Sequence, residues 1–316
     1  MNKKGADKMI KKIGRFNLLI FTLIFSLLNT GIYSTEICAE NRVKKINKYA
    51  NYVLERSFQN ISLEEQEKIK NYAHKICIAY SKLGDEKNCR LWYAHYVRLN
   101  AALHIAKATE TGSLKEWQIA LSKLDDCAKY YSGIYSYKEA RPFIPYTCGA
   151  AAKVKYQMAK ILNSSDAWLN AEQSFETAAN FYRAFGYTEE KNKFKFLGLL
   201  SECRNSLECC TISNRSSSVS ELKIILFELV EKSKEIKLDT LTIKNYQLAY
   251  EIVSKICCGF QKSDINLIYE ARSLMRTFEV CIKILPSSNS ESQDFFERFI
   301  TLMSPFINKL SVCYGL

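Results

Sequence analysis

The sequence predicts an all-α fold made of antiparallel helix hairpins, and three observations support this prediction. Glycine and proline are scarce, with 11 and 4 among the 316 residues. Apolar residues recur at the three-and-four spacing of one helix face, and no useful stretch alternates with the two-residue period of a strand. Capping patterns mark helix entrances along the chain. We therefore expect about ten helices of roughly twenty residues each, stacked as a repeat array or as an irregular bundle.

The first 39 residues have the three-part layout of a secretory signal. A basic stretch, Lys3 to Arg15, precedes an apolar run, Leu18 to Leu28, and small and polar residues follow up to Ala39. This run is shorter than the roughly 20 apolar residues that span a bilayer. We therefore expect a signal peptide over 1–39, cleaved after Ala39 or, as second choice, after Ser34. The predicted location is secreted or periplasmic, and an uncleaved membrane anchor is the alternative.

Helix entrances and breaks can be placed in order along the rest of the chain. The capping box is a Ser followed three residues later by Glu or Gln. It occurs at Ser62, Ser113, Ser218 and Ser290. The expected breaks lie near Gly84, Gly112, 133–145, Gly186, 211–218, Gly259 and 286–290. The polar run 211–218 is the expected boundary between an N-terminal helical lobe, 40–210, and a C-terminal helical lobe, 211–316.

The C-terminal lobe shows the helical spacing most clearly. Four successive segments each carry apolar residues that recur every three or four positions, which is the pattern of a helix with one buried face. These four apolar stripes begin at Leu222, Leu248, Leu267 and Phe295. We therefore expect four consecutive amphipathic helices after residue 218.

Two partial copies of a helix-hairpin pattern occur in the N-terminal lobe. The first, around Gly84, contains Ala73, Ile76, Cys77, Tyr80, Gly84, Cys89, Tyr93 and Tyr96. The second and weaker one, around Gly186, contains Phe175, Ala178, Ala179, Tyr182 and Gly198. This pattern resembles the tetratricopeptide repeat over about residues 42–208, a family in which small residues lie where two helices touch and aromatic residues fill the gaps between them. Tyr96 departs from the family, which usually has alanine there, and Lys191 departs from it where a small residue belongs.

This resemblance implies a groove lined by the first helix of each hairpin, which holds an extended peptide or a helix of another protein. The matching positions are Asn71, His74, Ile78 and Lys82 in the better copy and Gln173, Glu176, Asn180 and Arg183 in the weaker one. These residues lack the paired basic groups with which some family members clamp a terminal carboxylate. The resemblance therefore implies a protein or peptide partner without assigning its chemistry.

A tyrosine-rich interruption is the second candidate surface. It contains Tyr130, Tyr131, Tyr135, Tyr137, Arg141, Phe143 and Tyr146. Tyrosine and arginine are enriched at protein interfaces, because they combine a large contact area with a polar tip. The alternative is that these rings fill a gap between helical layers. We take Tyr135, Tyr137 and Arg141 as candidate partner-binding residues.

Twelve cysteines suit an exported protein, in which disulfides persist. No C-x-x-C spacing is present, so a structural zinc site is not expected. The repeat resemblance implies that Cys77 and Cys89 face each other across one helix hairpin and could form a disulfide. The other candidates are Cys127 with Cys148, and Cys257 or Cys258 with Cys281. The alternative is that these cysteines are free thiols that pack as small apolar residues at helix contacts.

Charge and motifs exclude several classes of function. The formal net charge is +12, but lysine is dispersed along the chain, so nucleic-acid binding is not expected. His74, His95 and His104 show no paired spacing for metal binding or catalysis, and no glycine-rich phosphate loop is present. We therefore expect a noncatalytic protein-interaction protein without a metal or cofactor. An enzyme with an unrecognised helical site and a membrane-tethered scaffold are the alternatives, and the oligomeric state is open.

Overall fold

The computed structural model of the protein describes residues 44, 46, 48–56, 61–213 and 216–313. The chain divides into two compact units, Met1–Glu55 and Arg56–Leu316. Residues 48–55 of the first unit are helical. The predicted signal peptide, 1–39, lies outside the described residues, so export and the membrane anchor both stay predictions. None of the helices in the described ranges has the length and apolar character that a membrane span requires.

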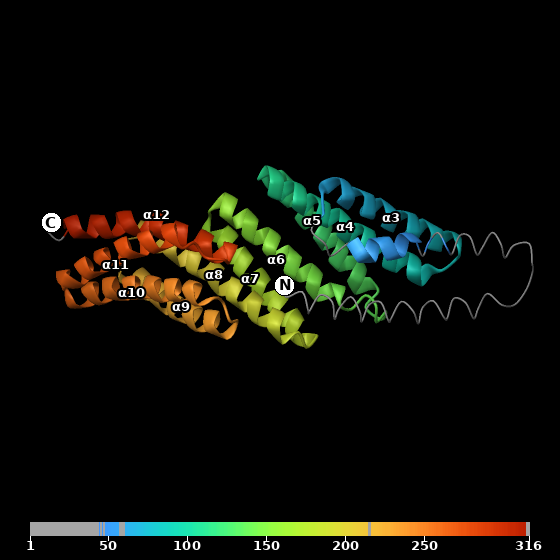
Figure 1. Ribbon diagram of the computed structural model, residues 1–316. Coiled ribbons are helices and arrows are strands. Elements are labelled where there is room, and N and C mark those ends of the chain that lie inside the picture. Colours follow the sequence, from blue (N-terminus) through green and yellow to red (C-terminus); the bar gives the residue numbers. More distant parts are fainter. Residues whose placement is uncertain (1–43, 45, 47, 57–60, 214–215, 314–316) are drawn as a thin grey trace, which may run out of the picture. The chain divides into compact units, whose positions relative to one another are not determined.

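The described part of the second unit is built from helices joined by short turns (Figure 1). Its ten helices are α3 (Leu63–Lys82), α4 (Glu86–Thr111), α5 (Leu114–Gly133), α6 (Phe143–Leu162), α7 (Ser165–Ala184), α8 (Thr188–Ser213), α9 (Ser216–Glu235), α10 (Thr240–Lys262), α11 (Ile265–Ile284) and α12 (Ser290–Cys313). No strand occurs in this part of the chain. The predicted all-α fold class is therefore confirmed.

The predicted caps are correct at the first two capping boxes and displaced at the other two. Ser62 and Ser113 each accept a hydrogen bond at Oγ from the amide three residues later, at 3.3 and 3.4 Å. Ser218 lies inside α9, which begins two residues earlier. At α12 the cap is Asn289, whose Oδ1 accepts from the Ser292 amide at 2.8 Å. The side chain one residue earlier therefore replaces the predicted cap, Ser290.

Glycine ends helices at three of the predicted breaks. Gly84, Gly112 and Gly186 have φ angles of 72°, 65° and 77°, in the left-handed region that residues with a Cβ seldom adopt. The break predicted near Gly259 comes at Ser263, the C-cap of α10, and Gly259 itself lies inside this helix. A Cβ there would lie 2.7 Å from Ile268 Cδ1 on α11. This glycine therefore allows two helices to approach closely and does not end a helix.

Consecutive helices pack against each other from α3 to α12, and α12 also packs back against α8 and α10. Helices α3 to α7 thus follow a simple order along the stack, whereas α8 to α12 close into a bundle (Figure 1). The sequence left the choice between a stacked array and a bundle open, and the second unit contains both arrangements. The narrower assignment to the tetratricopeptide repeat stays a prediction.

The largest buried cluster runs from Ala152 on α6 to Leu310 on α12. Its centre contains fully buried aromatic rings, among them Phe175, Phe278 and Phe296. Two smaller clusters occupy α4 to α6, one around Tyr131 and one around Trp117. The predicted lobe boundary at 210/211 falls in the last turn of α8, within the second compact unit. As a division between two separate domains, that boundary stays a prediction.

Three ion pairs hold α12 against the earlier helices. Arg298 donates from Nε and Nη2 to the two carboxylate oxygens of Glu208 on α8, at 2.7 and 2.9 Å. Asp294 pairs with the buried Arg204 of α8 at 3.5 Å and with Lys160 of α6 at 2.9 Å. One carboxylate and one arginine of α12, Asp294 and Arg298, therefore pair with an arginine and a carboxylate of α8 and fix the return of the last helix.

Candidate functional site

A pocket of about 310 Å³ lies where α3, α4 and α5 meet. Its lining is mostly apolar but includes two cationic side chains, Arg90 and Lys129. The lining residues are Cys77, Cys89, Arg90, Tyr93, Lys129, Tyr130, Gly133 and Ile134. Pockets of this size, with apolar walls and a few polar groups, are typical ligand-binding sites. The pocket includes Tyr130 and Ile134, so it adjoins the tyrosine-rich segment that the sequence singles out.

The turn between α3 and α4 positions the two cysteines of this pocket. Gly84 reverses the chain, and Asp85 then caps α4 by accepting from the Asn88 amide at 3.0 Å. Cys89 therefore lies in the first turn of α4, opposite Cys77 on α3. Their sulfur atoms are 3.6 Å apart. The sequence correctly predicted that these two residues face each other across the hairpin.

The predicted disulfides are nevertheless wrong. The ten cysteines from Cys77 to Cys281 are all free thiols. Even the closest predicted pair, Cys77 and Cys89, lies well beyond the bond length of about 2.05 Å. Burial and the neighbouring thiol raise the pKa of Cys77 to about 12. Its sulfur is therefore protonated at neutral pH and contributes an apolar surface to the pocket.

Cysteines of the other predicted pairs contact different neighbours. The Cys127 thiol lies 3.8 Å from the Ala94 carbonyl and 3.9 Å from Thr147 Oγ1, not against Cys148. The Cys257 thiol lies 3.3 Å from Ser220 Oγ. These thiols fill helix contacts, which is the alternative that the sequence left open.

Two tyrosines form one wall of the pocket. The rings of Tyr93 and Tyr130 meet edge to face, with centroids 4.8 Å apart. A hydrogen bond between their hydroxyls, together with burial, raises the pKa of Tyr93 to about 12. Beside them, Arg90 pairs with Glu86 on its own helix, whereas Lys129 is exposed and has no ion-pair partner in the described part of the chain. The pocket thus combines aromatic walls with a cationic edge.

The tyrosine-rich segment contains both buried and exposed rings. Tyr131 is fully buried, stacks on Phe143 with centroids 5.3 Å apart, and has its hydroxyl 3.0 Å from His95 Nδ1. Its ring therefore fills a gap between helices. In contrast, Tyr130, Tyr135 and Tyr146 keep 43%, 51% and 43% of their surface exposed. These three rings lie at the surface, and their use as an interface stays a prediction.

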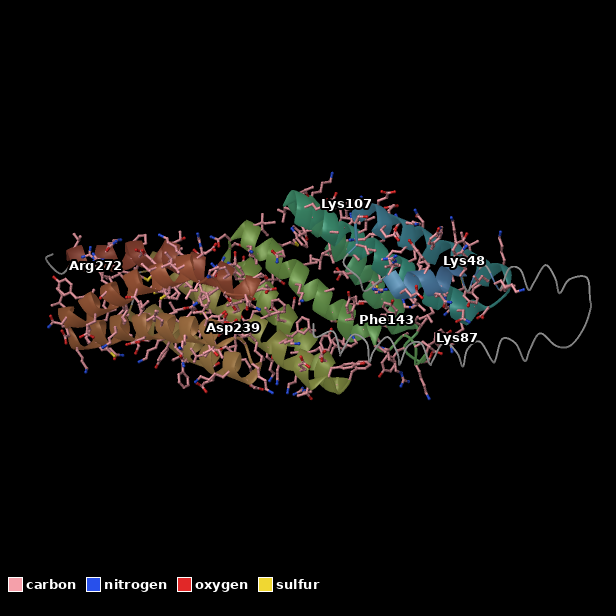
Figure 2. The ribbon with its side chains drawn as sticks, in the orientation of Figure 1. Lys48, Lys87, Lys107, Phe143, Asp239 and Arg272 are labelled. Atoms are coloured by element: carbon pink, nitrogen blue, oxygen red, sulfur yellow. The ribbon has the colours of Figure 1, made fainter. Side chains whose placement is uncertain are left out.

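Residues 134–142, which we call the tyrosine turn, hold three predicted partner-binding residues together. Arg141 Nε donates to the Tyr135 carbonyl at 3.1 Å, and the guanidinium lies 5.0 Å from the centre of the Tyr135 ring. The Tyr137 ring has Lys87 Nζ at 5.3 Å from its centre. Figure 2 labels Lys87 and also Phe143, which begins α6 directly after the turn. The turn is therefore a structured surface that presents aromatic and cationic groups.

A buried basic cluster under this turn was missed by sequence reasoning. Arg98 is 4% exposed, and its guanidinium lies 5.5 Å from the Phe143 ring and 5.9 Å from the Tyr146 ring. Burial and the charge of Arg98 lower the pKa of His95 to about 3, so this histidine is neutral at physiological pH. The spacing of Arg98 three residues after His95 on one face of α4 was the only available signal.

The other two histidines have separate contacts. His74 stacks against Tyr96 with ring centroids 4.8 Å apart, and His104 Nδ1 lies 2.7 Å from Glu116 Oε2. Within the described ranges, no three His, Cys, Asp or Glu side chains are placed to hold a metal ion. The absence of a metal, a cofactor and catalysis stays a prediction.

The predicted groove residues lie on two separate helices. Asn71, His74 and Lys82 are exposed on α3, with Ile78 beside them, and Gln173, Asn180 and Arg183 are exposed on α7, with Glu176. The main contacts of α3 are with α4, and those of α7 are with α6 and α8. The structure therefore does not bring these two sets together. Of the predicted partner-binding residues, it groups only those of the tyrosine turn.

Comparisons with known proteins add little to this description. No family model matches the chain, and no curated protein matches it. Among solved structures, it is similar to the crystal structure of the de novo designed helical repeat protein DHR64, with 14% identity, a TM-score of 0.26, and coverage of 72% of this chain and 99% of that one. The DHF119 filament is similar at 14% identity and a TM-score of 0.23, with coverage of 72% and 98%. Scores this low assign neither a family nor a function.

Proposed function

We propose that this protein is an exported, noncatalytic helical scaffold that binds a protein or peptide partner at the α3–α5 pocket and the tyrosine turn. One observation carries the proposal: a pocket of about 310 Å³ with tyrosine walls adjoins a turn whose Tyr135 and Arg141 are held in place. Tyrosine and arginine at such a position give a large contact area with little loss of side-chain freedom on binding.

The chemistry of the surface favours an acidic partner segment with an apolar anchor residue. The apolar walls suit one aliphatic or aromatic side chain, because burying it removes apolar surface from water. Lys129 at the pocket and Arg141 on the turn then lie beside the residues that flank this anchor. Complementary charge increases the rate of association and excludes basic segments.

Binding accounts for these groups better than catalysis does. A general base or nucleophile requires a pKa near the working pH. The pKa values of Cys77 and Tyr93 are instead raised to about 12, which keeps both groups protonated. The proposed export rests on the signal-like layout of residues 1–39, and N-terminal sequencing of the mature protein distinguishes cleavage from an uncleaved membrane anchor.

A peptide-display selection on the full chain tests the proposal. We expect enrichment of peptides with an apolar residue flanked by Asp or Glu. Tyr130→Ala and Lys129→Glu should abolish this enrichment, because they remove a pocket wall and reverse the charge at its edge. Tyr269→Ala is the matched control, since Tyr269 is an exposed tyrosine on α11. Equal enrichment on all variants, or none on the wild type, would contradict the proposed site.

A further inference from the structure

The hairpin of α11 and α12 contains a second, smaller pocket that the proposed function does not use. Arg272 and Arg276 lie one turn apart on α11, and Ser304 and Asn308 lie one turn apart on α12. Figure 2 labels Arg272. Met275, Glu279 and Ile307 complete the lining of a space of about 140 Å³. Four polar side chains from two helices thus border one concave site with a partly apolar floor.

The two arginines of this pocket differ from those that hold the fold together. Arg204 and Arg298 are each paired with a carboxylate of another helix. Arg272 and Arg276 have no ion pair or hydrogen bond to another side chain in the described part of the chain. Glu279 lines the same pocket but forms no ion pair with either arginine. Two guanidinium groups and one carboxylate leave the site with a formal charge of +1.

The donors of this pocket match a tetrahedral oxyanion. A guanidinium presents its N–H groups in a planar fork that fits two oxygens of a phosphate at once. Ser304 adds a hydroxyl donor and Asn308 an amide donor. A phosphate group presents three or four oxygens, so it can accept hydrogen bonds from both helices at once.

We propose that the Arg272–Arg276 pocket binds a phosphate group, either as free phosphate or as a phosphate monoester. Each arginine binds oxygens of the anion through charge-assisted hydrogen bonds, and Ser304 and Asn308 bind from the opposite helix. The dianion replaces the carboxylate partner that neither arginine has. This site does not depend on the α3–α5 pocket, because it is built entirely from α11 and α12.

Isothermal titration of the full chain with inorganic phosphate, against chloride at equal ionic strength, tests the proposal. Arg272→Gln and Arg276→Gln should each weaken binding by about tenfold or more, because each removes charged hydrogen bonds. Arg183→Gln, which removes an exposed arginine on α7, is the matched control and should leave the affinity unchanged. Ser304→Ala keeps every charge and should weaken binding by about threefold. Circular dichroism verifies that each variant is folded.

No saturable phosphate binding to the wild type, or the same affinity in all four variants, would overturn the proposal. Equal weakening in Arg183→Gln would also overturn it, because the effect would then be one of net charge. A second titration uses phosphatidylcholine vesicles with and without phosphatidic acid. If the protein binds inorganic phosphate but not the phosphatidic acid vesicles, its ligand is a small soluble phosphate. If it also binds the phosphatidic acid vesicles, its ligand is a lipid headgroup. Both results support the site.

Discussion

Removing the carboxylate of Asp294 should destabilise the protein more than removing its arginine partner. The side chain of Arg204 is 6% exposed, whereas that of Asp294 is 29% exposed. In Asp294→Ala, the buried guanidinium loses its counter-charge. Breaking a buried ion pair in this way costs about 3–5 kcal/mol. Arg204 keeps its hydrogen bond to the backbone carbonyl of residue 294 at 3.0 Å and its contact with the Trp168 ring at 5.2 Å. We therefore expect a loss of about 2–3 kcal/mol.

The reverse change, Arg204→Met, should be tolerated better. Asp294 then keeps Lys160 at 2.9 Å and stays partly in contact with water, while methionine fills the buried space of the arginine stem. We expect a loss of about 1 kcal/mol, and the double variant should lose no more than that, because it contains no unpaired buried charge. Lys160→Ala is the control for the exposed pair and should cost about 0–1 kcal/mol.

Urea unfolding followed by far-ultraviolet circular dichroism measures these free energies of unfolding, provided that the slopes with urea agree between variants. The test is whether Asp294→Ala loses more free energy of unfolding than Arg204→Met. Equal losses in Asp294→Ala and Arg204→Met, or a double variant that loses the sum of the two, would refute the reasoning. The return of α12 onto α8 would then depend on its apolar face, not on the buried pair.

Three further predictions follow from the packing of particular residues. Gly198→Ala should stabilise the protein by about 1 kcal/mol through helix propensity, because the nearest side-chain atom to the new Cβ is 3.6 Å away. Gly149→Ala should destabilise the protein by about 1–2 kcal/mol, because its Cβ would lie 2.5 Å from the Phe194 ring. Thermal unfolding compares the two variants. The pKa of His95 is lowered to about 3, so the unfolded chain binds a proton that the native protein does not. The free energy of unfolding should therefore rise with pH between about 3 and 6.5, by at most about 1.4 kcal/mol per pH unit, and level off above 6.5. Urea midpoints measured across this range should rise less steeply with pH in His95→Gln than in the wild type. The ten cysteines from Cys77 to Cys281 should all react with a thiol reagent in denaturant without reductant, because none of them is in a disulfide. Cys77 should react slowly in the native protein at neutral pH, because its pKa is raised to about 12. Mass spectrometry of the labelled peptides checks both expectations.

Local patterns in the sequence predicted the helices well because they depend on short-range physics. The caps at Ser62 and Ser113, and the glycine reversals at Gly84, Gly112 and Gly186, involve residues within one helical turn. The repeat resemblance placed Cys77 opposite Cys89 across one such reversal. It could not decide whether a bond forms between them, because that depends on the distance between two helices.

Features that join distant parts of the chain were not accessible from the sequence. The role of Gly259 is visible only when Ile268 on the next helix lies against it. The pairing of Arg298 with Glu208 joins residues 90 positions apart, and one sequence without relatives offers no signal for such a pair. The groove implied by the repeat resemblance also required contacts between alternate helices, whereas α3 packs mainly against α4. The tyrosine turn could be predicted because its residues are adjacent in the chain.

The largest buried cluster and the proposed binding surface lie in different parts of this protein. The cluster that runs through α6 to α12 is closed by α12, so its buried side chains are covered by the chain itself. The clusters of α4 to α6 are smaller, and Tyr130, Tyr135 and Tyr146 stay exposed in the same part of the chain. Apolar side chains are also exposed on α9 and α11, for example Ile224, Phe227 and Ile284. Exposure alone therefore does not select the α3–α5 pocket. The proposed site rests on a concave wall of tyrosines beside Lys129, where a partner would remove apolar surface from water and also meet a charge.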